Sequence, residues 1–209
     1  KSNTIYVVGC PLPNVTKASL LPVLDFQPVV LVIHQPLSPR YCSEKWEKSL
    51  YVNIISGLVD LGYKVIFKPH PRVISNEMLD SLKELISTSL KNHSMVEFIG
   101  RNSISENLLD QCDALISFNS VTSYTSLRMG IPTVFIKTPL LANKLLNRMS
   151  QLNEICYATD AKSVVMLIDQ ILKNEDLRNY WFDQGPLSAN KLSGSSEGFD
   201  NKWEAAASY

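Results

Sequence analysis

Short apolar segments alternate along the chain with segments whose apolar residues are spaced as on one face of a helix. The apolar segments are rich in β-branched residues and bounded by turn residues, which is typical of strands buried on both faces of a parallel sheet. This pattern predicts strands at Val29–Ile33, Tyr63–Phe67, Met95–Ile99, Ala114–Phe118, Pro132–Ile136 and Ile155–Ala158.

The segments between these strands predict helices. Their starts and ends carry capping signals, such as Ser43 before the first helix, Gly62 after it, and a Ser103/Glu106 capping box. We expect helices at Ser43–Leu61, Asn76–Leu90, Ser103–Cys112, Ser120–Met129, Leu140–Met149 and Asp160–Leu172.

Alternating strands and helices predict an α/β fold, with a doubly wound, mainly parallel, six-stranded Rossmann-like sheet. We assign this domain to residues 29–185, closed by a terminal helix that packs through Tyr180-Trp181. Residues 1–28 precede it with a strand at Ile5–Val8 and a connector. Residues 186–209 are polar and Gly/Ser-rich, which indicates a linker or tail.

Composition and charge exclude several classes of protein. Apolar residues make up 45% of the chain, and 20 basic residues balance 20 acidic ones, so net charge gives no indication of nucleic-acid binding. The four cysteines show no zinc-ligand or disulfide-framework spacing. With no apolar run long enough for a membrane span and no signal peptide, we expect a cytoplasmic protein. The chain begins at Lys1 without an initiator Met, as a fragment of a longer protein would.

Candidate chemistry gathers in the loops that follow three of the predicted strands. Ligands of doubly wound sheets bind at the carboxyl ends of the strands, where these loops lie. The loops are His34–Arg40 after the first strand, Lys68–Arg72 after the second and Ser117–Ser123 around the end of the fourth.

The strongest candidate is His70, within Lys68-Pro69-His70-Pro71-Arg72. The two prolines restrict the backbone on both sides of the imidazole, and Lys68 and Arg72 add positive charge. Such a group suits a phosphate, which His70 can stabilise as it leaves. The alternative is a solvated turn in which His70 bonds only to nearby backbone.

The loop after the fourth strand complements His70. Ser117, Asn119, Ser120, Thr122 and Ser123 supply polar groups at a helix start, where free N–H groups attract anions. Plain helix capping is the alternative interpretation.

Three further residues are weaker candidates. Gly100 ends the third strand, where backbone groups can meet a nucleotide base. Gln35 and Arg40 follow the first strand and are candidates for contacts with a donor or an acceptor. No P-loop, G-x-G-x-x-G, G-x-S-x-G or metal-ligand motif is present in the sequence.

In order and spacing, residues 29–172 resemble the nucleotide-binding half of GT-B glycosyltransferases. They are most similar to bacterial sialyltransferases and polysialyltransferases, with Kdo-transferring relatives, which use CMP-activated sugars. The matching pieces are Gln35-Pro36-Leu37, Lys68–Arg72, Phe98-Ile99-Gly100 with Ser105-Glu106, Ser117 with Ser120–Ser123, and Gly130-Ile131-Pro132.

The resemblance implies a metal-independent transfer of a sugar from a CMP-sugar to a surface glycan, as in capsule or lipopolysaccharide synthesis, without a cofactor. His70 would contact the donor phosphate, together with Lys68, Pro71 and Arg72. Gly100 would lie on the cytidine side, and Ser117, Asn119, Ser120, Thr122 and Ser123 would bind the phosphate. The expected partners are a nucleotide-sugar donor, a glycan acceptor and, peripherally at the inner membrane, the machinery of polysaccharide synthesis.

One departure from the family pattern leaves alternatives open. The Asp/Glu-Asp/Glu-Gly motif that carries the general base in these enzymes is absent, and at most residues 1–28 remain of the acceptor domain. We therefore expect this chain to bind nucleotide but to transfer poorly by itself. A CDP-polyol phosphotransferase with a similar His-Pro loop and a catalytically inert scaffold domain are the alternatives.

Overall fold

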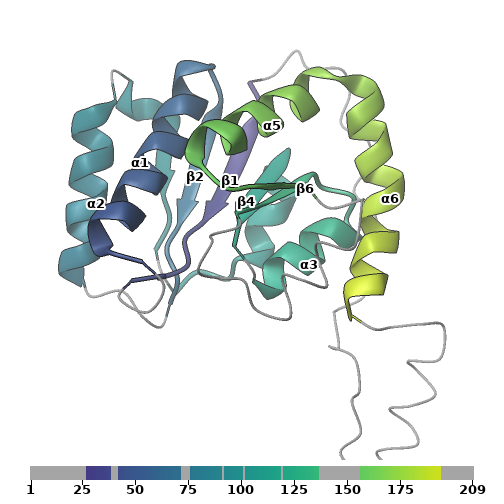
Figure 1. The fold of residues 1–209 in the computed structure, drawn as a ribbon, viewed down its shortest axis with the longest axis horizontal. Coiled ribbons are helices and arrows are strands. Elements are labelled where there is room, and N and C mark those ends of the chain that lie inside the picture. The colour runs from purple at the N-terminus through teal and green to yellow at the C-terminus, as the bar shows by residue number, and fades with distance from the viewer. Residues whose placement is uncertain are drawn as a thin grey trace, which may run out of the picture.

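The strands form one sheet, as predicted. The computed structural model describes residues 27–38, 42–71, 76–90, 92–100, 102–118, 120–136 and 156–193. All strand pairs in this part of the chain are parallel, in the order β3-β2-β1-β4-β5-β6. The strands are β1 (Val29–Ile33), β2 (Lys64–Lys68), β3 (Val96–Phe98), β4 (Ala114–Ser117), β5 (Thr133–Ile136) and β6 (Cys156–Ala158) (Figure 1).

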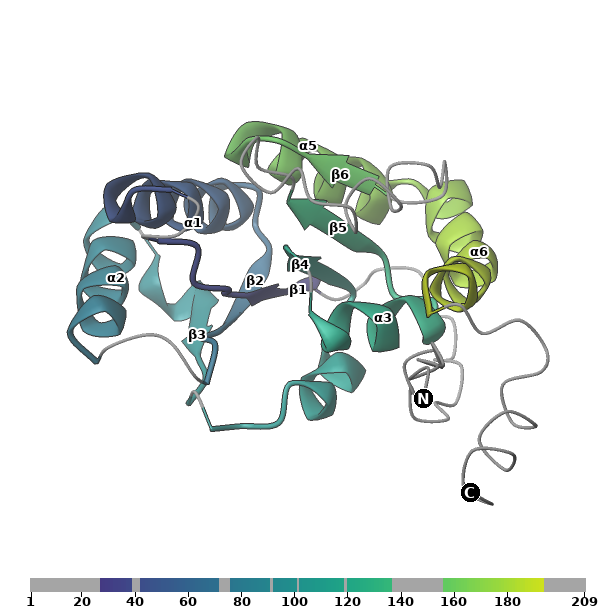
Figure 2. The same cartoon turned by 60° about the horizontal axis from the view of Figure 1, so that its bottom comes forward.

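Helices cover both faces of this sheet. Figure 2 shows α1 and α5 over one face and α3 over the other, with α6 beside α3. The helices are α1 (Glu44–Asp60), α2 (Asn76–Ser89), α3 (Val121–Arg128), α5 (Ala161–Lys173) and α6 (Glu175–Ser193), with short 3-10 helices η1 (His93–Met95) and η2 (Glu106–Gln111). The doubly wound fold is therefore confirmed. The predicted strand Ile5–Val8 and helix Leu140–Met149 lie outside the described residues.

The side chains of β1 show why the strands read as continuous apolar runs. Successive side chains of a strand point to opposite faces of the sheet. Val30 and Val32 enter the larger core cluster, whereas Leu31 and Ile33 enter a second cluster shared with η2. Because both faces are covered, no position along β1 favours a polar residue.

The start of α5 is capped by the Asp160 carboxylate, which accepts bonds from the Ser163 backbone N–H at 2.9 Å and hydroxyl at 2.7 Å. These bonds hold the pKa of Asp160 below its usual value. We expect Asp160→Ala to lower the free energy of unfolding by about 1 kcal/mol, whereas Asp160→Asn keeps most of the cap.

Denaturant unfolding at several pH values tests this cap. Because the folded pKa is lowered, the contribution of the carboxylate is present above roughly pH 4 and is lost as the pH falls through the folded pKa. The difference in the free energy of unfolding between the wild type and Asp160→Ala should therefore become smaller in acid. A deficit that stays constant down to pH 2 would contradict the role of the charge.

Two expectations about local structure are wrong. The helix does not begin at Ser103, whose backbone N–H donates to Gly100 O in a preceding turn. The helix that follows is the 3-10 helix η2, with Ser105 in the cap position and no side-chain capping bond.

The predicted tail boundary at residue 186 falls inside α6, which continues to Ser193. Trp181 is buried in the core, as expected, whereas Tyr180 beside it is exposed. Gly185 lets α6 approach α3 closely. A Cβ at Gly185 would lie 2.6 Å from Leu127 O. The composition of residues 186–193 indicated a linker, but in the structure these residues are helical.

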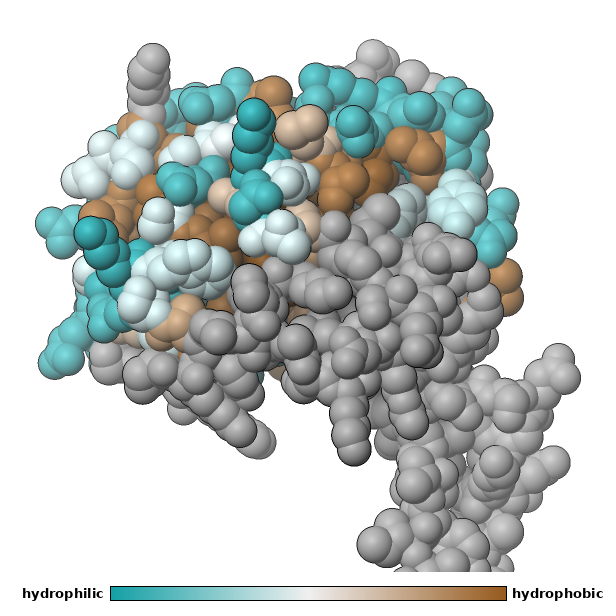
Figure 3. All heavy atoms as spheres, viewed as in Figure 1, coloured by the Kyte–Doolittle hydropathy of each residue, from teal (hydrophilic) through white to brown (hydrophobic). Residues whose placement is uncertain are grey.

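Figure 3 shows polar and apolar residues mixed over the face that carries α1 and α5, with apolar residues gathered near α5, the helix of the exposed Met166. Within the described ranges, no helix has the length and apolar character needed to cross a bilayer.

Candidate functional site

The strand order creates a switch point beside β1. From β1 the chain builds outward to β2 and β3, and it then returns to place β4 on the other side of β1. Ile33 pairs with Lys68 on one side and Val32 pairs with Ile116 on the other, so the three strands end at the same level. Since neighbouring strands lie about 4.8 Å apart, the ends of β2 and β4 are roughly 10 Å apart, close enough to flank one ligand.

The loop after β2 places His70 at this edge. His70 is half-buried, Pro69 before it is buried and Pro71 after it is exposed. The predicted neighbour Arg72 lies outside the described residues. His70 therefore comes from a proline-bracketed turn on one side of the switch point.

Lys68, predicted to add positive charge beside His70, is enclosed by the protein. Its side chain is 1% exposed, and its ammonium group donates to Pro69 O at 2.9 Å. This burial argues against direct contact with a ligand.

The start of α3 holds a chain of serine hydroxyls. Ser120 is the N-cap and its hydroxyl accepts from Ser123 N–H at 3.3 Å. The Ser117 hydroxyl donates to Ser120 Oγ at 3.3 Å, and Ser123 Oγ lies 3.1 Å from Ser120 Oγ. Ser117 and Ser123 are fully buried, whereas Ser120 is half-buried. Of these three serines, Ser120 is therefore the one that a ligand can reach.

Two of the remaining predicted contacts, Thr122 and Gly100, lie at the same edge. Thr122 is buried in the first turn of α3, and Gly100 is exposed just after β3. Arg40 and Asn119 lie outside the described residues. Ligand contacts for all of these residues stay predictions.

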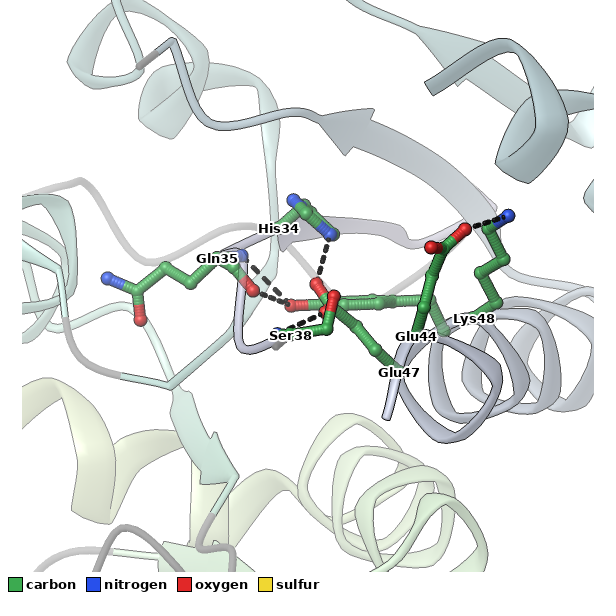
Figure 4. A network of polar contacts seen from close by, with 7 residues as sticks. His34, Gln35, Ser38, Glu44, Glu47 and Lys48 are labelled. Atoms are coloured by element: carbon green, nitrogen blue, oxygen red, sulfur yellow. Dashed lines mark hydrogen bonds and ion pairs between the residues drawn. The ribbon is translucent and has the colours of Figure 1, made fainter. Parts of the chain in front are cut away.

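A polar network that the sequence analysis missed lies between β1 and α1 (Figure 4). The Glu47 carboxylate accepts from Ser38 N–H at 2.7 Å, and its other oxygen lies 2.9 Å from His34 Nε2. The Tyr51 hydroxyl accepts from Gln35 N–H at 2.9 Å and donates to Gln35 O at 3.3 Å. We call Glu47 and Tyr51 the α1 clamp, because both hold the loop that follows β1.

The α1 clamp is buried, and its ionisation follows its contacts. Burial opposes the charge of Glu47, but the contacts with His34 and Ser38 outweigh it and lower the pKa of Glu47. Burial also raises the pKa of Tyr51 well above its usual value, so its hydroxyl stays protonated. The His34 ring is fully buried against the rings of Tyr51 and Phe67. Because this ring is enclosed, it is not a base within reach of a substrate.

One signal in the sequence indicates this network. Positions 47, 51, 54, 55 and 58 recur at helical spacing, and all face the core. Glu47 is the charged residue in this otherwise largely apolar stripe, and a carboxylate is rarely buried without a partner. Its partner, however, is revealed only by the fold.

No group of three or more His, Cys, Asp or Glu residues in the described part of the chain is arranged to hold a metal ion. The independence from metal implied by the resemblance stays a prediction.

The sequence matches the family model of alpha-2,8-polysialyltransferase (POLYST) over residues 22–129. The chain belongs to this family. The matched region of the polysialyltransferase family includes the loops after β1 and β2, the α1 clamp and the whole of α3. The chain has no match among curated proteins.

Solved structures share the fold at low sequence identity. MurG from Acinetobacter baumannii is 12% identical with a TM-score of 0.55, covering 90% of this chain and 51% of its own. UDP-GlcNAc 2-epimerase from Neisseria meningitidis, bound to UDP-GlcNAc, is 10% identical with a TM-score of 0.56, covering 81% of this chain and 43% of its own. CalG4, the calicheamicin glycosyltransferase, is 13% identical with a TM-score of 0.52, covering 86% and 43% respectively.

This polysialyltransferase-family chain therefore spans about half the length of the solved structures that it matches. The expected likeness to one half of a GT-B glycosyltransferase is confirmed at the level of fold and family.

Proposed function

We propose that this chain is the donor-binding half of a glycosyltransferase that transfers a sugar such as sialic acid or Kdo from a CMP-sugar to a surface glycan. The observation that carries the proposal is the strand order, in which His70 follows β2 and Ser120 follows β4, one on each side of β1. Membership of the polysialyltransferase family supports glycosyltransferase activity. The choice of a CMP-sugar donor follows from the resemblance of the sequence to sialyltransferases and polysialyltransferases.

The chemistry assigned to the site follows from where charge develops. A bond forms between an acceptor oxygen and the anomeric carbon, while the bond from that carbon to a phosphate oxygen of CMP breaks. The departing phosphate gains negative charge, which the His70 imidazole and the positive dipole end at the start of α3 stabilise. The acceptor proton passes to a base outside this half of the enzyme. No metal or cofactor takes part in the proposed reaction.

The proposed setting follows from the same resemblance. The enzyme would act in the cytoplasm, peripherally at the inner membrane, on a glycan made by membrane-bound machinery. Cytidine would lie toward Gly100 and the phosphate toward Ser120.

Calorimetric titration of the 209-residue chain with CMP, CDP, UDP and GDP tests this proposal. We expect CMP to bind most tightly and to raise stability by about 2.7 kcal/mol at one hundred times its Kd. UDP is the informative competitor, because three of the similar structures were solved with UDP or UDP-GlcNAc. A preference for UDP would contradict the proposed donor, a preference for CDP would favour a CDP-polyol phosphotransferase, and no binding would favour an inert scaffold.

A further inference from the structure

The loop of residues 34–38 occupies the centre of the proposed donor site. It follows β1, and β1 lies between β2 and β4, whose loops carry His70 and Ser120. A ligand that spans those two loops therefore passes over this one. Gln35 is half-buried in this loop.

The α1 clamp fixes the backbone on both sides of the Gln35 side chain. The Tyr51 hydroxyl binds both the N–H and the carbonyl of Gln35, at 2.9 and 3.3 Å. Two bonds from one hydroxyl to one residue restrict both peptide groups that flank its Cα. In Figure 4 the Gln35 side chain extends away from α1, on the side opposite the clamp.

Glu47 holds the same loop at its two ends. It lies one helical turn before Tyr51 and contacts His34 at the start of the loop and Ser38 at its end. Both His34 and Glu47 have fully buried side chains. Burying a carboxylate is unfavourable unless contacts of this kind compensate, and an apolar residue would fill the space more simply. A buried glutamate at position 47 is therefore explained by its role in ordering the loop.

We propose that Glu47 and Tyr51 are positioning residues, which hold the loop after β1 so that the Gln35 side chain contacts the CMP-sugar donor at the switch point. This inference rests on the proposed function. Gln35 is thus a third donor contact, between His70 and Ser120, and the α1 clamp acts on the donor only through it.

Paired tyrosine variants test the inference. Tyr51→Phe removes the hydroxyl that holds Gln35, whereas Tyr63→Phe removes a hydroxyl that donates to Asp169 Oδ1 at 2.7 Å, between the start of β2 and α5. We expect both variants to be less stable to heat. Only Tyr51→Phe should weaken CMP binding, by about three- to tenfold, in line with the loss of a well-placed hydrogen bond.

A double variant shows whether the clamp acts through Gln35. In a Gln35→Ala background, adding Tyr51→Phe should leave the Kd for CMP unchanged within about twofold. If Tyr51→Phe does not fold, Glu47→Gln replaces it in both comparisons, since it keeps the shape and removes the charge.

The outcomes separate this inference from the proposed function. If the wild-type chain binds no CMP, the proposed function fails and the inference fails with it. If the wild-type chain binds CMP but Tyr51→Phe binds it no more weakly than Tyr63→Phe does, only the inference is overturned. Weaker binding by Tyr51→Phe that persists without the Gln35 side chain would also overturn it.

Discussion

Replacing His70 by alanine should weaken CMP binding by roughly ten- to hundredfold, the effect of removing one hydrogen bond to a charged phosphate. The imidazole is half-buried between Pro69 and Pro71, which restrict the loop backbone whether or not the ring is present. The expected change is therefore a loss of binding without a loss of fold, measured by calorimetry and thermal unfolding on the same samples.

Two controls separate this effect from a general one. His93→Ala removes an exposed imidazole from η1, before β3, and should leave the Kd for CMP unchanged. Cytidine lacks the phosphate, so its weaker binding should be insensitive to His70→Ala. An equal loss for CMP and cytidine would show that His70 does not act on the phosphate.

The largest stability effect is expected from Gly185→Ala. A Cβ at this position would lie 2.6 Å from the backbone oxygen of Leu127 in α3, and backbone cannot move aside as a side-chain end can. Helix propensity favours Ala by about 1 kcal/mol, but the overlap outweighs it. We expect a net loss of about 2 kcal/mol in the free energy of unfolding, measured with denaturant.

Gly57→Ala is the matched control. It makes the same change in α1, where the added Cβ would meet the Val165 side chain of α5 at 2.9 Å rather than a backbone atom. Rotation or a small shift of that side chain relieves the contact, so the loss should be smaller than that of Gly185→Ala. Equal losses would show that α3 and α6 do not depend on this close approach.

The strands, the helix starts and the candidate loops could be predicted from the sequence for simple physical reasons. Strands covered on both faces, such as Val29–Ile33, must be apolar throughout, and Ser43, Ser120 and Asp160 mark helix starts by their capping side chains. The loops that matter then follow from the rule that ligands bind at the carboxyl ends of parallel strands.

The features that were missed depend on contacts between distant segments. Glu47 of the α1 clamp contacts His34 and Ser38, and nothing in the sequence near Glu47 specifies those partners. α6 continues past residue 186 although the composition there is typical of a linker, and Gly185, just before this point, packs closely against Leu127. Lys68 was predicted as a donor contact, but the fold around the end of β2 buries its side chain.

The proposed site requires His70 and Ser120 to act on the same phosphate. A double-mutant cycle of His70→Ala and Ser120→Ala, with CMP affinity as the measurement, tests this directly. We expect the losses of CMP binding free energy in the two single variants to be coupled by about 1 kcal/mol or more, because each group orients the phosphate for the other. Losses that add within about 0.3 kcal/mol would show that the two residues act independently, and would contradict the shared site.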